Sequence, residues 1–261
     1  MAEENENKVL GKFVWHDLMT NDVDKAVSFY TGLFGWTIKE VDMGPMGTYK
    51  MIQAAGTEHG GFVGLAPEDN LPSHWTSYVT VDDVDATVAR AVELGGKAPV
   101  PPMDIPGTGR FAVIVDPHGA VISPYTPKAW GGEGAAPQAG TFCWHELLAV
   151  DPEAEGAFFR ELFGWTSEAM DMGPMGTYHI FKRGEKMEAG ALQKPEGQGG
   201  PSAWLPYIAV DDVDATAARV EGLGGKIFVP PTDIPDVGRF SVLADPTGAS
   251  IALLQALPMA G

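Results

Sequence analysis

The chain has 261 residues and a formal net charge of −18, so it is long enough for two ordinary domains. The negative charge argues against nucleic acid and anionic membranes as partners, because both would repel the protein. A single cysteine, Cys143, excludes a disulfide within the chain, and its apolar neighbours favour a small core side chain over a reactive thiol. The polar, acidic N-terminus and the lack of a long apolar run predict a cytoplasmic protein without a signal peptide or membrane span.

The first stretch of the chain predicts one strand, one helix and three more strands. Residues 1–12 are largely polar, and we expect them to form a disordered lead-in. Phe13–Leu18 mixes aromatic and β-branched residues, as strands do. Asp22 is suited to cap a helix whose apolar residues recur every three or four positions and which Gly35 ends. Strands are then expected at 37–41, 48–54 and 61–66, with a turn at 44–47.

The same order of elements then occurs a second time, between residues 75 and 125. A strand at 75–81 precedes a helix that is capped by Asp82 or Asp83 and ends at two glycines, Gly95 and Gly96. Asp116-Pro117-His118-Gly119 has the composition of a hairpin turn. The remaining strands are expected at 97–100, 110–115 and 120–125. The first half of the chain therefore consists of two βαβββ modules.

The second half of the chain repeats the first half at a constant shift of 129 positions. Trp15-His16-Asp17-Leu18 returns as Trp144-His145-Glu146-Leu147, and Asp42–Tyr49 returns unchanged as Asp171–Tyr178. The segments 81–87 and 109–111 return at 210–216 and 238–240. A residue that both halves need for the same chemistry should occur in both copies.

The repeat predicts an α+β protein of two similar domains, at residues 13–127 and 142–256. Residues 128–141 are rich in Gly, Ala and Pro, and we expect them to form a flexible linker. A two-module protein would need to form a dimer to bring four modules together, whereas this chain contains all four. A monomer is therefore plausible, and a homodimer is not excluded.

These motifs resemble those of the vicinal oxygen chelate superfamily, which includes glyoxalase I, extradiol dioxygenases, and fosfomycin and bleomycin resistance proteins. The resemblance is carried by Phe29-Tyr30 with Leu33-Phe34-Gly35, by the helix start at 81–85, and by the Gly-Arg-Phe and Asp-Pro-x-Gly segments. The tandem layout and the Trp-His-Asp/Glu-Leu opening are similar to two-domain actinobacterial proteins labelled hydroxylase or glyoxalase-like. The resemblance implies four modules whose mixed sheets curl into cups, but it leaves the function open because this fold has many functions.

Metal-dependent members of the superfamily hold their metal with side chains from the first, fifth and eighth strands and from the fourth. By resemblance, the first of these positions falls on Trp15 and Trp144, and a shift of one residue would put His16 and His145 there instead. The other positions fall on Thr76 and Leu205, on Ser123 and Ala252, and near Gly64 and Gln193. A divalent metal needs several imidazole, thiolate or carboxylate ligands, and these strands do not supply them. The usual metal centre is therefore expected to be absent, and no cofactor is predicted.

Strand alternation places Trp15 and Asp17 on one face of the first strand, and Trp144 and Glu146 on one face of its copy. If Trp15 faces the cup, the tryptophan forms an aromatic wall beside one carboxylate. That carboxylate, Asp17 or Glu146, would have a raised pKa and act as a general base or a hydrogen-bond partner. The structural alternative is a core tryptophan beside a solvated or capping acid.

The histidines follow a different pattern. His16 and His145 occur in both copies, and the structural interpretation buries them behind the sheet with a backbone hydrogen bond. His118, like the other three histidines, has no histidine counterpart and is expected on the surface or in a loop.

The retained octapeptide supplies further ligand-binding candidates, because its surroundings have diverged. Between residues 50 and 71 only Gly61 matches its counterpart. A loop at the rim of a cup would use such side chains for adaptable contact with an apolar ligand. The alternative is that the hairpin packs identically against the neighbouring copy. The candidates are Met46, Thr48, Tyr49, Met175, Thr177 and Tyr178.

Two more pairs of retained residues are ligand-binding candidates. Trp75 and Trp204 open the fifth strand of each copy. Arg110 and Arg239 begin the seventh strand and are suited to hold an anionic group with two hydrogen bonds. The structural alternative pairs these arginines with Asp104 and Asp233.

Together these features favour a protein that binds a small aromatic or amphipathic molecule in an aromatic-walled cup without the usual metal centre. The alternative is a metal-independent enzyme of the same fold that uses Asp17 or Glu146 as its acid or base. A metal-dependent glyoxalase- or dioxygenase-type enzyme is the third hypothesis, and the ligand chemistry favours it least.

Overall fold

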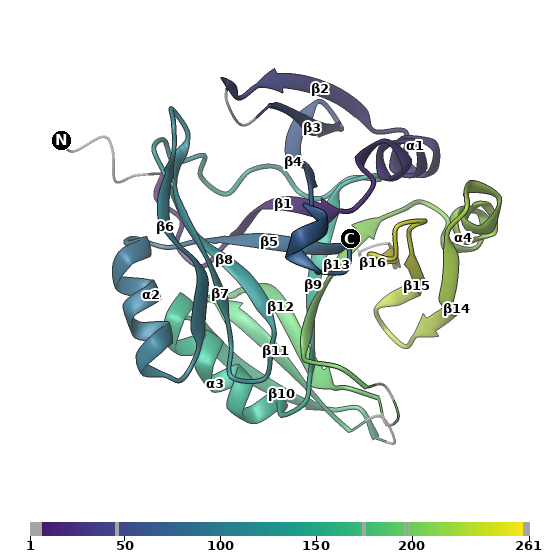
Figure 1. Cartoon of the computed structure of the whole chain (residues 1–261). Coiled ribbons are helices and arrows are strands. Elements are labelled where there is room, and N and C mark those ends of the chain that lie inside the picture. The colour runs from purple at the N-terminus through teal and green to yellow at the C-terminus, as the bar shows by residue number, and fades with distance from the viewer. Residues whose placement is uncertain (1–6, 45–46, 174–175, 196, 198, 258–261) are drawn as a thin grey trace. The chain divides into compact units, whose positions relative to one another are not determined.

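The computed structural model describes residues 7–44, 47–173, 176–195, 197 and 199–257 (Figure 1). Met46 and Met175, two of the predicted ligand contacts, lie outside the described residues. The elements of the first copy are β1 (Phe13–Thr20), α1 (Val23–Phe34), β2 (Thr37–Asp42), β3 (Thr48–Ala54), β4 (Thr57–Gly64), β5 (His74–Thr80), α2 (Val84–Glu93), β6 (Lys97–Ile105), β7 (Gly109–Val115) and β8 (Val121–Pro127).

The second copy repeats this order of strands and helices. Its elements are β9 (Phe142–Ala149), α3 (Pro152–Phe163), β10 (Thr166–Asp171), β11 (Thr177–Arg183), β12 (Lys186–Gln193), β13 (Ala203–Ala209), α4 (Val213–Val220), β14 (Lys226–Ile234), β15 (Gly238–Ala244) and β16 (Ser250–Ala256). The predicted βαβββ modules and the α+β class are confirmed. None of the helices described is long and apolar enough to cross a membrane.

Each copy contributes one eight-stranded sheet. The strand orders are β2-β3-β4-β1-β5-β8-β7-β6 and β10-β11-β12-β9-β13-β16-β15-β14. Within each module the first and last strands are parallel, as in β1 with β4 and β5 with β8, and the hairpins are antiparallel. The sheets are therefore mixed, as predicted.

The helix boundaries follow from local side-chain chemistry. The Asp22 carboxylate accepts a hydrogen bond from the Lys25 N–H at 3.0 Å and caps α1. Gly35 ends the same helix in a left-handed conformation with φ of 70°. Of the two predicted caps for α2, Asp83 is the one that accepts the Ala86 N–H, at 3.0 Å.

β4 and β6 differ most from their predicted ranges of 61–66 and 97–100, for physical reasons. β4 begins at Thr57 because Gly60 pairs closely with His16, where an added Cβ would lie 1.8 Å from the His16 carbonyl oxygen. Gly60 therefore serves a close approach of two backbones. β6 continues to Ile105 through Pro101 and Pro102, which an edge strand tolerates.

The chain forms two compact units, and each unit contains one module from each copy. Unit 1 consists of Met1–Trp15, Ser77–Ala135 and His145–Trp204, and unit 2 of His16–Thr76, Ala136–Trp144 and Leu205–Gly261. Within unit 1, α2 and α3 lie side by side, and within unit 2, α1 contacts α4 (Figure 1). The linker up to Ala135 belongs to unit 1, where Glu133 forms ion pairs with Arg183 at 2.8 Å and Lys186 at 3.0 Å, and the rest of the linker belongs to unit 2.

Each unit has its own aromatic core between helix and sheet, and the two cores differ at one polar contact. In unit 2 the Trp75 indole N–H donates to the Tyr30 hydroxyl at 3.0 Å. In unit 1 the equivalent of Tyr30 is Phe159, which packs against Trp204 with ring centroids 5.1 Å apart. The Trp204 indole N–H is buried and has no hydrogen-bond partner among the described residues.

This difference predicts that Phe159→Tyr stabilises the protein. The new hydroxyl would accept the buried Trp204 N–H, and one such hydrogen bond contributes about 1 kcal/mol to the free energy of unfolding. Urea denaturation of wild type and variant measures the change. Tyr30→Phe is the matched control and should lower the free energy of unfolding, because it leaves the Trp75 N–H unsatisfied. A Phe159→Tyr variant less stable than wild type would contradict the prediction.

Candidate functional site

A tyrosine–carboxylate pair lies on β1 and β3 in unit 2. The Tyr49 hydroxyl donates a hydrogen bond of 2.6 Å to Asp17 Oδ1, and Asp17 is only 7% exposed. Asp17 pairs in register with Gly61 on β4, where an added Cβ would lie 2.2 Å from Tyr49 Cζ. The Tyr49 ring therefore crosses β4 over the bare backbone of Gly61 to reach Asp17.

The second copy builds the same pair in unit 1. The Tyr178 hydroxyl donates to Glu146 Oε2 at 3.1 Å. Glu146 pairs in register with Gly190, where a Cβ would lie 1.9 Å from the Tyr178 hydroxyl oxygen. This geometry explains why Tyr49 and Gly61 both return in the second copy. The retained tyrosines pack within their own modules, whereas Thr48 and Thr177 are exposed at the starts of their strands.

Both pairs lie on the sheet face that is turned away from the helix of their module. Leu18 on β1 and Ile52 on β3 belong to the core that contains α1. Side chains alternate along a strand, so Asp17 and Tyr49 lie on the opposite face. Trp15 on β1 and Trp144 on β9 are half-buried.

His16 lies in the core of unit 2, as the structural interpretation expects. Its Nδ1 donates to the His59 carbonyl oxygen at 3.1 Å, and its ring stacks on Phe142 with centroids 3.6 Å apart. Burial lowers the pKa of His16 from 6.5 to about 3, which outweighs the opposing hydrogen bond to the His59 carbonyl. In unit 1, His145 stacks on Phe13 with the same centroid distance of 3.6 Å.

Trp75 and Trp204 occupy the aromatic cores. Trp75 is 5% exposed and Trp204 is 7% exposed, and both pack among the side chains of a helix. Their burial favours a packing role over the predicted ligand contact.

Arg110 and Arg239 form ion pairs. The sequence did not predict their main partners, Asp85 and Asp214, each of which accepts two hydrogen bonds from its arginine. Arg110 contacts Asp104 at 2.9 Å, as the structural alternative expects, and holds Asp85 with two hydrogen bonds of 2.6 and 3.0 Å. These contacts lower the pKa of Asp85 and raise that of Arg110. Arg239 pairs in the same way with Asp214 and Asp233. The last aspartate of the Val-Asp-Asp-Val-Asp motif, Asp85 or Asp214, binds the arginine of its copy. Its presence in both copies was the sequence signal for the ion pair.

The strand positions that hold a metal in the superfamily do not fit one in this chain. Thr76, Leu205, Ser123 and Ala252 are buried and carry no imidazole, thiolate or carboxylate. The Gln193 amide donates to the backbone carbonyls of Ala149 and Val150 at 3.3 and 2.9 Å. Over the described residues, one group of three acidic or histidine side chains is close enough to hold a metal, and it lies on other elements: Asp116, His118 and Glu155.

Cys143 is half-buried on β9, at the position where the first copy has Val14. Its Sγ lies 3.5 Å from the Tyr207 carbonyl oxygen. Burial raises the pKa of the Cys143 thiol to about 12, so the thiolate needed for reactivity is scarce at neutral pH.

Comparisons with known proteins identify both copies. A family model described as the Glyoxalase/Bleomycin resistance protein/Dioxygenase superfamily matches residues 12–123, and one described as a Glyoxalase-like domain matches residues 144–254. The chain is 37% identical to the putative glyoxylase CFP32 of Mycobacterium tuberculosis, over 94% of both chains. It is 31% identical to the anthracycline biosynthesis protein DnrV of Streptomyces peucetius, over 94% of this chain and 93% of that protein.

Solved structures of low sequence identity share the fold. The Mn(II)-bound glyoxalase from Novosphingobium aromaticivorans aligns with a TM-score of 0.66 and 16% identity, over 95% of this chain and 83% of that one. The 2,3-dioxygenase LapB from Pseudomonas sp. KL28 aligns with a TM-score of 0.62 and 14% identity, over 95% and 94% of the two chains. At these identities the likeness concerns the fold alone.

Proposed function

The chain belongs to the glyoxalase/bleomycin resistance protein/dioxygenase superfamily, and within it we propose that the protein binds a hydroxylated aromatic small molecule. The observation that carries the proposal is the tyrosine–carboxylate pair, Tyr49 with Asp17 and Tyr178 with Glu146, on the helix-free face of each first module. A residue pair built twice by the same backbone close approach meets the expectation for a function shared by both copies.

The chemistry of the pair indicates the class of ligand. A phenol has one proton, and Tyr49 donates it to Asp17, so the oxygens of the pair act as hydrogen-bond acceptors. An acceptor-rich polar spot on a sheet surface matches a ligand that carries hydroxyl groups on an apolar frame. Two relatives, DnrV and DauV, are named anthracycline biosynthesis proteins, and anthracyclines are hydroxylated polycyclic aromatic compounds.

A metal-independent enzyme is the second candidate function. The short bond of 2.6 Å joins a buried carboxylate to a hydroxyl, which is an arrangement that can take up a proton at Asp17 Oδ1 and return it. The relative named putative glyoxylase favours catalysis in this lineage. The side chains at the superfamily's metal positions favour both of these candidates over a metal-dependent reaction.

Titration with a hydroxylated anthracycline such as daunorubicin, followed by tryptophan fluorescence, tests the proposal. Tyr49→Phe with Tyr178→Phe is expected to weaken binding by up to about tenfold, because each site loses the tyrosine oxygen that would accept a hydrogen bond from the ligand, and such a bond contributes roughly 0.5–1.5 kcal/mol. Trp15→Ala with Trp144→Ala is expected to weaken it more. Glu68→Gln, an exposed acid on a short turn, is the control and should bind as wild type does.

The same titration separates binding from catalysis. In a binding protein, Asp17→Asn with Glu146→Gln lowers affinity modestly, and mass spectrometry finds the compound unchanged. In an acid–base enzyme, the same variant keeps its affinity and loses turnover. If wild type neither binds nor converts hydroxylated aromatic compounds, both candidates are wrong.

A further inference from the structure

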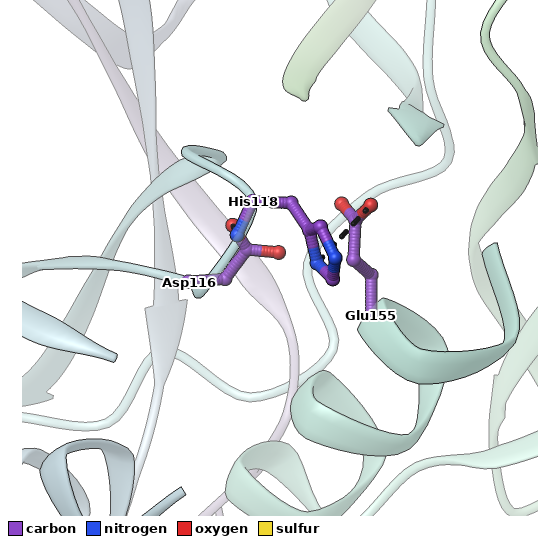
Figure 2. Close-up of side chains that lie close together, drawn as sticks. All are labelled: Asp116, His118 and Glu155. Carbon is purple, nitrogen blue, oxygen red and sulfur yellow. Dashed lines mark hydrogen bonds and ion pairs between the residues drawn. The ribbon is translucent and has the colours of Figure 1, made fainter. Parts of the chain in front are cut away.

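A second constellation of titratable groups lies in unit 1, outside the tyrosine–carboxylate pairs. Asp116 and His118 come from the turn between β7 and β8, and Glu155 from the first turn of α3 (Figure 2). One ligand atom of each side chain lies within 4.8 Å of the others. Figure 2 shows the His118 ring between the two carboxylates. The turn belongs to the first copy and the helix to the second, so the three residues meet only because unit 1 combines modules of both copies.

Each carboxylate is held by one of its oxygens and leaves the other unpartnered. Asp116 Oδ1 accepts the backbone N–H groups of His118 and Ala120 at 2.9 and 2.7 Å. Glu155 Oε1 accepts the Asp151 N–H and the Ser202 hydroxyl, both at 2.9 Å. The second oxygens, Asp116 Oδ2 and Glu155 Oε2, are buried with no hydrogen-bond partner, and so is His118 Nδ1.

The burial of these atoms is unusual. Asp116 is 4% exposed and Glu155 is 0% exposed. A buried carboxylate oxygen without a partner is costly, and two such carboxylates close together repel each other unless a proton or a cation lies between them. His118 Nδ1 lies 3.7 Å from Glu155 Oε1, which is beyond hydrogen-bond distance, so within the described part of the chain no hydrogen bond from a positive group reaches either carboxylate (Figure 2).

Unit 2 has the equivalent turn and helix but no carboxylate at the position of Glu155. The equivalents of Asp116, His118 and Glu155 are Asp245, Thr247 and Ala26. The Thr247 hydroxyl donates to Asp245 at 2.7 Å and lies 3.1 Å from the Thr20 hydroxyl. Burial and the charge of Asp245 both raise the pKa of Tyr30. Asp245 Oδ2, like Asp116 Oδ2, is buried without a hydrogen-bond partner among the described residues, so unit 1 differs from unit 2 in its second carboxylate and its imidazole.

Unit 1 lacks each of these hydroxyl groups. Phe159 stands where Tyr30 would be and Ala149 where Thr20 would be, while His118 and Glu155 add an imidazole and a carboxylate. These exchanges remove hydrogen-bond donors from around the aspartate and add two groups that bind metals. The aspartate that pairs with hydroxyl and backbone groups in unit 2 therefore belongs, in unit 1, to a set of three side chains of metal-ligand type.

We infer that Asp116, His118 and Glu155 hold a divalent transition-metal ion, of which Zn²⁺ and Mn²⁺ are the representatives to test. The imidazole nitrogen favours these ions over Mg²⁺ and Ca²⁺, which prefer oxygen ligands alone. The hydrogen bonds to Asp116 Oδ1 and Glu155 Oε1 orient the ligands in advance. The His118 side chain is 33% exposed and gives the ion access from solvent. Bound there, the ion ties the β7–β8 turn to α3 and stabilises unit 1.

Metal content and thermal unfolding of the full chain test this inference. The protein is stripped with a chelator and then given ZnCl₂ or MnCl₂ alone. We expect about one ion per chain by plasma mass spectrometry, and a rise in melting temperature of roughly 5 °C when the free ion is about 100-fold above its dissociation constant.

Matched variants assign the effect to these residues. Glu155→Gln keeps the shape of the side chain and one acceptor oxygen, and is expected to lose both the bound ion and the temperature shift. His118→Thr with Glu155→Ala reproduces the residue types of unit 2 and should also lose both. Glu161→Gln, on the exposed face of the same helix, is the control and should keep the full response. His118→Thr alone supplies the same readout if the Glu155 variants fold poorly.

Two results would overturn the inference. A wild-type protein that binds no ion, with a Glu155→Gln variant at least as stable, would show that Glu155 shares a proton with Asp116. Burial and the charge of Asp116 both raise the pKa of Glu155, so this outcome has a physical basis. Ion binding that persists unchanged in the Glu155→Gln and double variants would show that the ion sits elsewhere on the acidic surface.

Discussion

Gly61→Ala is expected to detach Tyr49 from Asp17 while the protein stays folded. The new methyl group would lie 2.2 Å from Tyr49 Cζ, which is far inside van der Waals contact. The obstructing atoms belong to the end of a side chain and not to backbone, so the ring can swing away at a cost of roughly 1–3 kcal/mol in the free energy of unfolding. Once displaced, the Tyr49 hydroxyl can no longer donate to Asp17, and the acceptor pair is lost.

The effect on ligand affinity should equal or exceed that of Tyr49→Phe, which is up to about tenfold at that copy. Fluorescence titration with the same anthracycline measures it, and Gly190→Ala is the equivalent change in the second copy. Gly64→Ala on the same strand is the control, because its Cβ would meet only Val23 Cγ2, at an ordinary distance of 3.6 Å. Equal affinities for Gly61→Ala and Gly64→Ala would separate the tyrosine–carboxylate pair from ligand binding.

The protein is expected to lose stability steeply as the pH falls below 6.5, because of His16. Burial holds the pKa of His16 at about 3 in the folded protein, against an ordinary value of 6.5. Between these values the unfolded chain binds a proton at His16 and the folded protein does not. Stability is therefore fully present above pH 6.5 and falls toward pH 3, by at most about 1.4 kcal/mol for each pH unit.

His16→Asn isolates this contribution. The variant loses the stack on Phe142 and should be less stable than wild type at neutral pH, yet its free energy of unfolding should vary less between pH 6.5 and 4. Urea denaturation at a series of pH values gives both slopes. His74→Asn, at the first residue of β5, is the control and should keep the wild-type dependence of stability on pH. A His16→Asn slope as steep as that of wild type would place the acid sensitivity in other groups.

Local signals were sufficient to predict the modules. Asp22 and Gly35 bracket α1 as predicted, and β3 has its predicted bounds of Thr48–Ala54, because caps and alternation depend on neighbouring residues alone. β4 was predicted to begin at residue 61 and begins at Thr57, because Gly60 is required by the backbone of a strand that is distant in sequence. Such a requirement is invisible until the pairing of the two strands is known.

The candidate site was predictable only in part. Asp17 and Tyr49 were both singled out, but their hydrogen bond depends on the register of three strands. His118 lies in a loop, as its missing counterpart suggests, yet it faces two buried carboxylates from another part of the chain. The signal for this cluster was the difference between copies at Glu155 and Ala26, an acid against a methyl group on the buried face of a helix.

The exchange of modules between the two copies has a consequence for how this chain can change over time. Neither copy can be deleted or shuffled alone, since each removal would take half of both cores. Because both copies are in one chain, each core always combines one module of the first copy with one module of the second. A mutation in one copy therefore changes only one side of a core. A pair of identical subunits would carry every substitution twice. In a fused chain the two cores can differ, as they do at Phe159 against Tyr30 and at Glu155 against Ala26.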